Sequence, residues 1–225
     1  MAMKMDSKKS MNTKPETRNS QQIKLFITGI GTEVGKTVCS AILTKYFNAD
    51  YWKPIQSGDL HFSDSMKIKD WIGENLIIHP EKYRLQLAAS PHQSAAEERI
   101  SININDFQLP ETQNNLIVEG AGGLMVPLSD SEFMIDLIEK LHIPAALVVR
   151  NYLGCINHTL LSIMALNQKK INLKYLILNG NFPPDTERVI CKNIQPETGI
   201  IRIPDIKNLT RENIESITKQ LTKIG

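Results

Sequence analysis

The stretch GIGTEVGKT, residues Gly29–Thr37, decides the fold. It follows a β-branched segment at residues 23–28 and precedes a helical pattern at residues 35–47. A glycine-rich turn between a strand and a helix is the context of a phosphate-binding loop, because backbone amides and the helix N-terminus both attract phosphate oxygens. Lys36 is placed to reach the β- and γ-phosphates, and the Thr37 hydroxyl is placed to bind Mg²⁺. Ile30 stands where a strict Walker A motif has glycine, so the sequence predicts a variant loop that binds a nucleoside triphosphate.

Uninterrupted apolar runs elsewhere predict further buried strands. We expect strands at residues 51–53, 116–119, 145–149, 175–178 and 199–203, and helices at residues 131–141, 155–168, 185–193 and 210–222. Strands that alternate with helices favour βαβ units and a parallel sheet. The predicted fold class is therefore α/β, a P-loop NTPase-type three-layer fold with a mostly parallel central sheet flanked by helices.

The charge distribution separates the first 22 residues from the rest. The chain has 225 residues and a net charge of +2, and residues 1–22 carry five basic and two acidic side chains. The remainder is therefore at −1, which argues against a nucleic-acid partner. We expect residues 1–22 to be a disordered basic leader and residues 23–225 to form a single domain.

Hydropathy and cysteine content indicate the compartment. The sequence has no apolar run near the roughly 18 residues that span a bilayer, so we expect no membrane partner. The three cysteines are widely and irregularly spaced, which is typical of a reducing compartment. Together with the absence of a secretory signal pattern in residues 1–22, this predicts a cytoplasmic protein.

Three charged residues outside the loop are candidates for the same site. Glu119 ends a buried strand and is followed by Gly120–Gly123, at the sheet edge where open α/β folds bind ligands. Lys53 ends a short strand just before Pro54, where it could hold an anion or a transferring phosphoryl group. Asp64 is only weakly indicated by spacing, and on its own reads as an acid at a helix N-terminus.

Five motifs together resemble one family. They are GIGTEVGKT (Gly29–Thr37), KPIQSG (Lys53–Gly58), SPH (Ser90–His92), VEGAGG (Val118–Gly123) and LGCINH (Leu153–His158), in the order and spacing of dethiobiotin synthases. The resemblance covers about residues 23–206, and the longer phosphate loop is the family's own pattern. It implies a single P-loop synthase domain over residues 23–225. It also implies a cyclo-ligase of biotin biosynthesis that converts 7,8-diaminopelargonate, CO₂ and ATP to dethiobiotin, ADP and phosphate, through a carbamate and a carbamic–phosphoric mixed anhydride.

The resemblance also implies residue roles. The catalytic residues would be Lys53, Lys36 and Thr32, and the Mg²⁺ ligands would be Thr37, Asp64 and Glu119. The nucleotide contacts would be Glu33, Val34, Gly35, Lys36, Thr37, Val38, Asp64, Glu119, Gly120, Ala121, Gly122, Asn179, Gly180, Pro204, Asp205 and Ile206. The substrate contacts would be Ser57, Lys53, Gly154, Cys155, Ile156 and Asn157.

Two positions on the base side depart from the family. The family often has Asn-Asp where this chain has Asn179 and Gly180, so one acidic side chain is missing and the preference for ATP over other nucleotides stays open. The family commonly carries bulkier apolar residues after Pro204, which leaves the contact of Asp205 with the base open.

The Gly154–His158 turn implies a homodimer. In the family this turn opens a helix and contacts the substrate carboxylate across a subunit interface, as a helix N-terminus can. Cys155 and His158 are not expected to act as a nucleophile and base, since phosphoryl transfer needs neither. His92 is expected to shape the diamine pocket without transferring a proton.

Two other classes share parts of this pattern. Cobyrinic acid amidating enzymes carry the same loop with an additional C-terminal glutaminase domain, for which we expect no room within residues 23–225. ParA/MinD-type ATPases would be expected to have a basic DNA-binding patch or a membrane-targeting helix. The stretch 210–224 is mixed in charge and weakly amphipathic, which disfavours that class.

Overall fold

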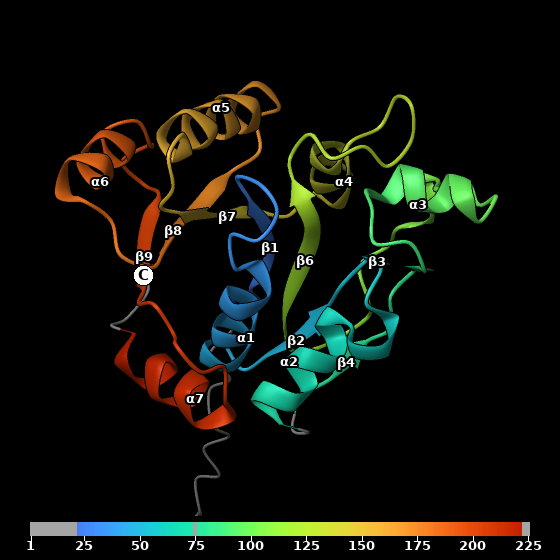
Figure 1. Cartoon of the computed structure of the whole chain (residues 1–225), viewed down its shortest axis with the longest axis horizontal. Helices are drawn as coiled ribbons and strands as arrows, with labels where there is room; N and C mark the ends of the chain where they lie inside the picture. The colour runs from blue at the N-terminus through green and yellow to red at the C-terminus, as the bar shows by residue number, and fades with distance from the viewer. Residues whose placement is uncertain (1–21, 74–75, 222–225) are drawn as a thin grey trace, which may run out of the picture.

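A seven-stranded parallel sheet forms the centre of the computed structural model, which describes residues 22–73 and 76–221 (Figure 1). Its strand order is β4-β2-β6-β1-β7-β8-β9, and every pair in it is parallel. The strands are β1 (Lys24–Gly29), β2 (Ala49–Trp52), β4 (Ile78–His79), β6 (Asn115–Gly123), β7 (Ala145–Arg150), β8 (Leu173–Asn179) and β9 (Gly199–Ile203). The predicted fold class is confirmed. The expected leader lies outside the described residues, apart from Gln22.

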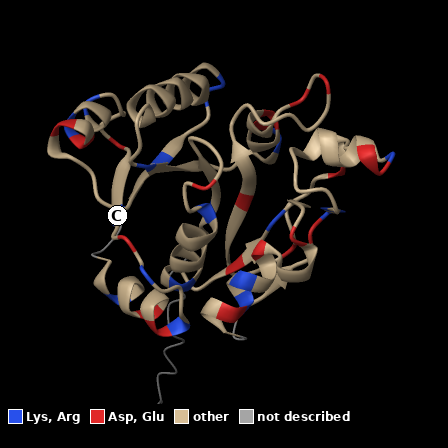
Figure 2. Cartoon of the chain, viewed as in Figure 1, with Lys and Arg blue, Asp and Glu red and all other residues tan. Residues whose placement is uncertain are grey.

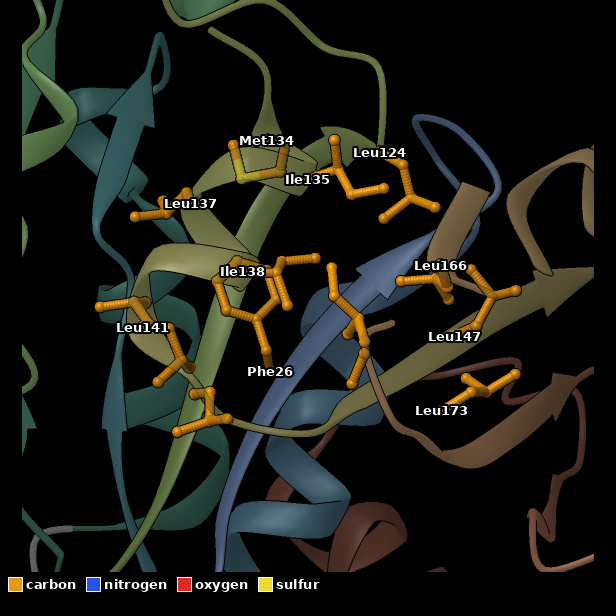
Figure 3. Close-up of a cluster of buried hydrophobic side chains, with 14 of the residues drawn as sticks. Phe26, Leu124, Met134, Ile135, Leu137, Ile138, Leu141, Leu147, Leu166 and Leu173 are labelled. Atoms are coloured by element: carbon orange, nitrogen blue, oxygen red, sulfur yellow. The ribbon is translucent and has the colours of Figure 1, made fainter. Parts of the chain in front are cut away.

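Helices cover both faces of the sheet because the strand side chains alternate between two apolar clusters. Leu25 and Ile27 of β1 face a cluster completed by α1 (Lys36–Tyr46), α2 (Asp64–Ile72) and α7 (Arg211–Gln220). Phe26 points to the opposite cluster, completed by α4 (Met134–Leu141), α5 (Cys155–Gln168) and α6 (Pro184–Cys191). Figure 3 shows this second cluster, with the apolar side chains of α4 around Phe26. The two clusters make the three-layer arrangement.

The segment between β2 and β6 contains short elements that the sequence did not reveal. They are β3 (Ile55–Ser57), the 3₁₀ turn η1 (Leu60–Phe62), β5 (Tyr83–Leu85), α3 (Pro91–Glu97) and a second 3₁₀ turn, η2 (Ile104–Asp106). Helix α2 and strand β4, given above, also lie in this segment and were not among the expected helices and strands. Strands β3 and β5 form a separate two-stranded parallel sheet. This segment lies beside the end of β6 in Figure 1 and supplies one wall of the cleft described below.

Most of the predicted strands and helices are confirmed, with ends that differ by a few residues. One expectation was wrong: β6 does not end at Glu119 but continues through Gly123. The reason is tertiary, because Gly29 pairs with Gly123, and a Cβ on Gly123 would lie 3.2 Å from the Gly29 carbonyl oxygen. Any side chain at position 123 would require the neighbouring strand to shift by a few tenths of an ångström, which glycine avoids.

Charged residues of both signs are interspersed along the helices and loops (Figure 2). Among the described helices, none has the length and apolar character needed to cross a membrane.

Candidate active site

Strand order brings the phosphate loop, Lys53 and Glu119 to one edge of the sheet. Strand β6 lies between β1 and β2, so the residues that follow β1 and β2 flank the end of β6. In the register, Trp52 is paired with Val118 and Ile27 with Glu119. Lys53, directly after Trp52, is therefore a neighbour of Glu119. Three segments far apart in the chain meet at the carboxyl ends of parallel strands, where open α/β sheets bind ligands.

The phosphate loop is fastened to the end of β8. Gly35 is the N-cap of α1 and has a φ of 88°, which is left-handed backbone that glycine adopts without strain. The buried Asn179 side chain donates a hydrogen bond from Nδ2 to the Val34 carbonyl oxygen at 2.8 Å. A Cβ on Gly35 would lie 2.2 Å from Asn179 Nδ2. The loop conformation therefore depends on a glycine at position 35 and an amide at position 179.

Lys36 folds back over the loop in this structure. Its Nζ donates to the Gly31 carbonyl oxygen at 2.9 Å. Burial lowers the pKa of Lys36 to about 8, and the nearby positive charge of Lys53 contributes in the same direction. A phosphate would favour the ammonium form, because an opposite charge nearby stabilises a charged group.

Lys53 lies between the two predicted carboxylates. Its Nζ is 2.6 Å from Asp64 Oδ2 and 3.0 Å from Glu119 Oε1, and it also donates to the Gly120 carbonyl oxygen at 3.4 Å. Burial by itself would lower the pKa of Lys53, but the charges of Glu119 and Asp64 outweigh it, so the pKa lies above its ordinary value. Lys53 is therefore a buried ammonium that stays charged at neutral pH.

The three predicted metal ligands form a set of oxygens around this ammonium. Thr37 donates from Oγ1 to Glu119 Oε1 at 2.9 Å, and Asp64 and Glu119 both contact Lys53. Oxygen ligands suit a hard cation such as Mg²⁺, which usually takes one or two carboxylates and completes its coordination with water and phosphate. No group of three or more His, Cys, Asp or Glu able to hold a metal occurs among residues 22–73 and 76–221. The donor set therefore fits Mg²⁺ carried by a nucleotide rather than an all-protein metal cage.

Three residues of the site were missed by the sequence analysis. Tyr51 donates its hydroxyl to Glu119 Oε2 at 3.0 Å, and Gln56 accepts from the Asp64 backbone N–H at 3.2 Å. Lys67 lies one helical turn after Asp64, with its Nζ 3.3 Å from Asp64 Oδ1. The i, i+3 spacing of Lys67 was a readable signal. The role of Tyr51 depends on the pairing of β2 with β6, which the sequence does not specify, and that of Gln56 depends on the turn that brings it to the start of α2.

A cleft of about 890 Å³ contains most of the predicted nucleotide and catalytic residues. From the predicted set, its lining includes Thr32, Glu33, Gly35, Lys36, Thr37, Val38, Lys53, Ser57, Asp64, Glu119, Ala121 and Gly122. The described segment between β2 and β6 adds Ile55, Gln56, Asp59, Phe62, Lys67, Trp71, Ala88, Ala89, Ser90 and Pro91. The phosphate loop thus forms one side of the cleft, and polar and apolar side chains of the segment between β2 and β6 form the other.

The predicted substrate residues Gly154–Asn157 are not brought into this cleft. They form the start of α5, where Gly154 is the N-cap with a φ of 102° and Cys155 is buried. A second hollow of about 510 Å³ lies nearby, lined by residues 30–34 together with Arg150, Tyr152 and His158. Within one chain, the start of α5 and the Lys53 cleft are therefore on different sides of the phosphate loop.

On the predicted base side, Asp205 packs against Gly180. A Cβ on Gly180 would lie 2.9 Å from Asp205 Oδ1. Asp205 also pairs with Arg150 at 3.1 Å and accepts from Asn181 Nδ2 at 3.2 Å. An acidic side chain is thus present beside Gly180, but it comes from the residues after β9.

Known proteins are similar to this chain over most of its length. A family model described as an AAA domain matches residues 23–213. The ATP-dependent dethiobiotin synthetase BioD of Christiangramia forsetii is 49% identical over 74% of this chain and 81% of its own length. The same-named protein of Cytophaga hutchinsonii is 41% identical over 88% of this chain and 96% of its own.

Among solved structures, a ParA family ATPase from Chlorobium tepidum matches with a TM-score of 0.47 and 14% identity, covering 89% of this chain and 99% of its own. The sequence relatives, in contrast, match at high identity across most of both chains. The chain therefore belongs to the ATP-dependent dethiobiotin synthetase family.

Proposed function

We propose that the chain converts 7,8-diaminopelargonate, CO₂ and ATP to dethiobiotin, ADP and phosphate. The observation that carries this proposal is the buried Lys53 ammonium, held beside the phosphate loop in a cleft that also contains Lys36. A switch ATPase transfers the phosphoryl group to water and does not need a buried cation for a second anionic substrate. A ligase that joins two anions does, because cations must bring them together and hold the charge of the transition state.

The proposed reaction has three bond-forming steps. One amine of the substrate adds CO₂ and loses a proton, which gives a carbamate. A carbamate oxygen attacks the γ-phosphorus and ADP leaves, so that a mixed anhydride forms. The second amine then attacks the carbamate carbon, loses a proton, expels phosphate and closes the cyclic urea. Lys53 would contact both the carbamate and the γ-phosphate, and Lys36 and Thr32 would hold the phosphate side.

ATP would occupy the phosphate loop with its base toward Asn179 and residues 204–206. Asn179 already uses its Nδ2 to hold the loop, which leaves Oδ1 to accept from an amino group of the base. Bound Mg²⁺ would neutralise phosphate charge, with Thr37, Asp64 and Glu119 as its protein-side oxygens. To take these positions, Lys53 and the two carboxylates must exchange their present ion pairs for contacts with ligands.

The variant Lys53→Gln tests the catalytic assignment. It should abolish dethiobiotin formation while leaving ATP binding largely intact, because Lys53 is assigned to the transferring group rather than to the nucleotide. Lys45→Gln is a matched control, since Lys45 pairs with Glu215 on the protein surface away from the cleft. Dethiobiotin and phosphate are measured together after incubation with the diamine, bicarbonate, Mg²⁺ and ATP. Near-normal product from Lys53→Gln, or phosphate release that does not require the diamine, would contradict the proposal.

We further propose that two copies of the chain complete each site. The start of α5 does not face its own cleft, and α5 and the preceding turn carry exposed apolar side chains at Leu153, Leu161 and Met164. A second copy that covers this surface could bring Gly154–Asn157 to the carboxylate of a substrate in the first copy's cleft.

Light scattering should find a dimer, and Leu153→Asp should give a monomer with little synthase activity. Ile77→Asp, at an exposed aliphatic position beside β4, is the control that should stay dimeric. A fully active monomer would refute the shared site.

A further inference from the structure

Glu119 has both carboxylate oxygens engaged in different tasks. Its side chain has no solvent exposure. Oε1 faces the cleft side and is shared by Lys53 Nζ at 3.0 Å and Thr37 Oγ1 at 2.9 Å. Oε2 accepts a hydrogen bond from the Tyr51 hydroxyl at 3.0 Å. The two oxygens are therefore not equivalent, and the tyrosine determines which of them is presented to ligands.

Tyr51 is held in place by the strand and the apolar core in which it lies. It lies in β2, is fully buried, and is paired in register with Ile117 of β6, two residues before Glu119. Its ring belongs to the apolar cluster formed with α1 and α2. Such packing fixes the position of the phenol oxygen, because core side chains interdigitate with few voids. A donor on a rigid strand can hold the carboxylate plane in one orientation.

The hydroxyl acts as a donor under all ordinary conditions. A phenol keeps its proton at neutral pH, and an ionised carboxylate oxygen such as Glu119 Oε2 can only accept a hydrogen bond. Glu119 Oε2 is buried, and a buried carboxylate oxygen without a donor is costly. Removal of the hydroxyl would therefore favour rotation of the carboxylate toward the donors Lys53 and Thr37, with both oxygens competing for the same neighbours.

We propose that Tyr51 is a positioning residue that holds Glu119 so that Oε1 alone is presented to the cation site of the cleft. The proposal rests on the function proposed above, in which Glu119 is an oxygen ligand of the nucleotide's Mg²⁺. Outer partners that orient a ligating carboxylate are commonly as important as the carboxylate itself, and their loss typically reduces metal affinity or activity by roughly 10- to 100-fold. The effect of Tyr51 should appear in metal affinity rather than in the capacity for chemistry.

Tyr51→Phe removes the hydroxyl and retains the ring. The matched control is Tyr83→Phe, which removes a hydroxyl that also donates to a carboxylate, Asp106 Oδ2, at a position outside the cleft lining. Mn²⁺ affinity is measured by electron paramagnetic resonance with a non-hydrolysable ATP analogue bound. Dethiobiotin formation is then followed against Mg²⁺ concentration. Thermal unfolding of each variant monitors folding.

The expected result is a loss of Mn²⁺ affinity of roughly 10- to 100-fold in Tyr51→Phe and no loss in Tyr83→Phe. The KM for Mg²⁺ should rise by a similar factor, while kcat approaches the wild-type value at high Mg²⁺. If Tyr51→Phe does not fold, Tyr51→Met fills the core position with a flexible apolar side chain and should show the same loss.

The proposal would be overturned by Mn²⁺ affinity within about twofold of wild type, or by equal losses in both tyrosine variants. A fall in kcat without a rise in the KM for Mg²⁺ would also overturn it, because that pattern belongs to a damaged site rather than a misplaced ligand. Failure of the proposed function is a separate outcome, recognised by a wild-type protein that makes no dethiobiotin.

Discussion

Substitution of Gly35 by alanine should damage the phosphate loop in two ways that can be measured separately. A non-glycine residue at a φ of 88° adopts left-handed backbone, which costs about 1–2 kcal/mol. The new Cβ would also lie 2.2 Å from Asn179 Nδ2, so the amide must move away. Its hydrogen bond to the buried Val34 carbonyl oxygen is then lost, at a cost of about 1–3 kcal/mol. Together these terms predict a loss of about 2–5 kcal/mol in the free energy of unfolding.

Urea unfolding without nucleotide measures the change in the free energy of unfolding. Calorimetry with ADP measures binding, because a loop that relaxes into another shape would retain stability but bind ADP more weakly. Gly31→Ala is the control in the same loop, because its Cβ meets nothing within 4 Å and its φ is not left-handed. Gly31→Ala should leave the free energy of unfolding nearly unchanged.

The double variant Gly35→Ala/Asn179→Ala separates the two contributions. Asn179→Ala removes the amide that the new Cβ would strike, so the double variant should be more stable than the sum of the single losses predicts. Neighbours that share a contact typically deviate from additivity by 0.5 to about 3 kcal/mol. The reasoning is refuted if Gly35→Ala matches Gly31→Ala in both stability and ADP affinity. Additivity of the two single losses would refute the assigned clash.

Two shorter predictions concern charge. Lys36→Gln should weaken ATP and ADP binding, because Lys36 is assigned to the phosphates; unchanged affinity by calorimetry would contradict the loop assignment. Asp50 is buried, which would raise its pKa, but hydrogen bonds from Thr112, Asn114 and the Ile77 N–H, together with the charge of His79, lower it below the ordinary value. A carboxyl with a lowered folded-state pKa stabilises the fold above its unfolded pKa of about 3.9, and this stability is lost as the pH falls further. The difference in unfolding free energy between wild type and Asp50→Asn should therefore narrow on acidification, and a constant difference would be inconsistent with the lowered pKa.

The central strands could be predicted from the sequence because buried parallel strands are continuous apolar runs. The segments at β7 and β8 have almost no polar interruption, and their burial in the structure is nearly complete. The segment between β2 and β6 could not be predicted in the same way. Strand β4 has only two residues, and β3 and β5 pair over only three positions. Strands this short show no recognisable apolar pattern in the sequence. The extension of β6 through its glycines was missed because the contact with Gly29 is tertiary.

The sequence allowed several residues of the candidate site to be named, but not the contacts between them. Lys53 and the phosphate loop could be nominated because each follows a strand, and Glu119 because it ends the apolar run that predicts β6; the ends of such strands meet at one sheet edge. Their contacts depend on β6 lying between β1 and β2, an order that the sequence does not specify. The hydroxyl of Tyr51 is in contact with Glu119 for the same reason, and in the sequence Tyr51 is only another residue of a short strand.

The charge of the cleft argues that a cation must accompany the triphosphate. Among the residues that the structure describes, three lysines line it, Lys36, Lys53 and Lys67, against four carboxylates, Glu33, Asp59, Asp64 and Glu119, so this lining has a formal charge of −1. The N-terminus of α1 adds only about half a positive charge. A polyanion that enters this cleft without Mg²⁺ would meet a site that does not neutralise it. Removal of Mg²⁺ by a chelator should therefore weaken ATP binding.

Glu119→Gln distinguishes a carboxylate that binds the cation from one that only repels phosphate. Without Mg²⁺, loss of this negative charge removes its repulsion of the phosphates and should strengthen ATP binding; with Mg²⁺, loss of a ligand should weaken it. Asp59→Asn is the control, because Asp59 lines the cleft, lies outside the predicted ligand set, and has a left-handed φ of 51° that asparagine tolerates. It should strengthen binding slightly under both conditions. Calorimetry measures the ATP affinity of both variants with and without Mg²⁺. Only a residue that binds the cation should change ATP affinity in opposite directions in the two buffers. A change of the same sign for Glu119→Gln in both buffers would exclude Glu119 from the cation site.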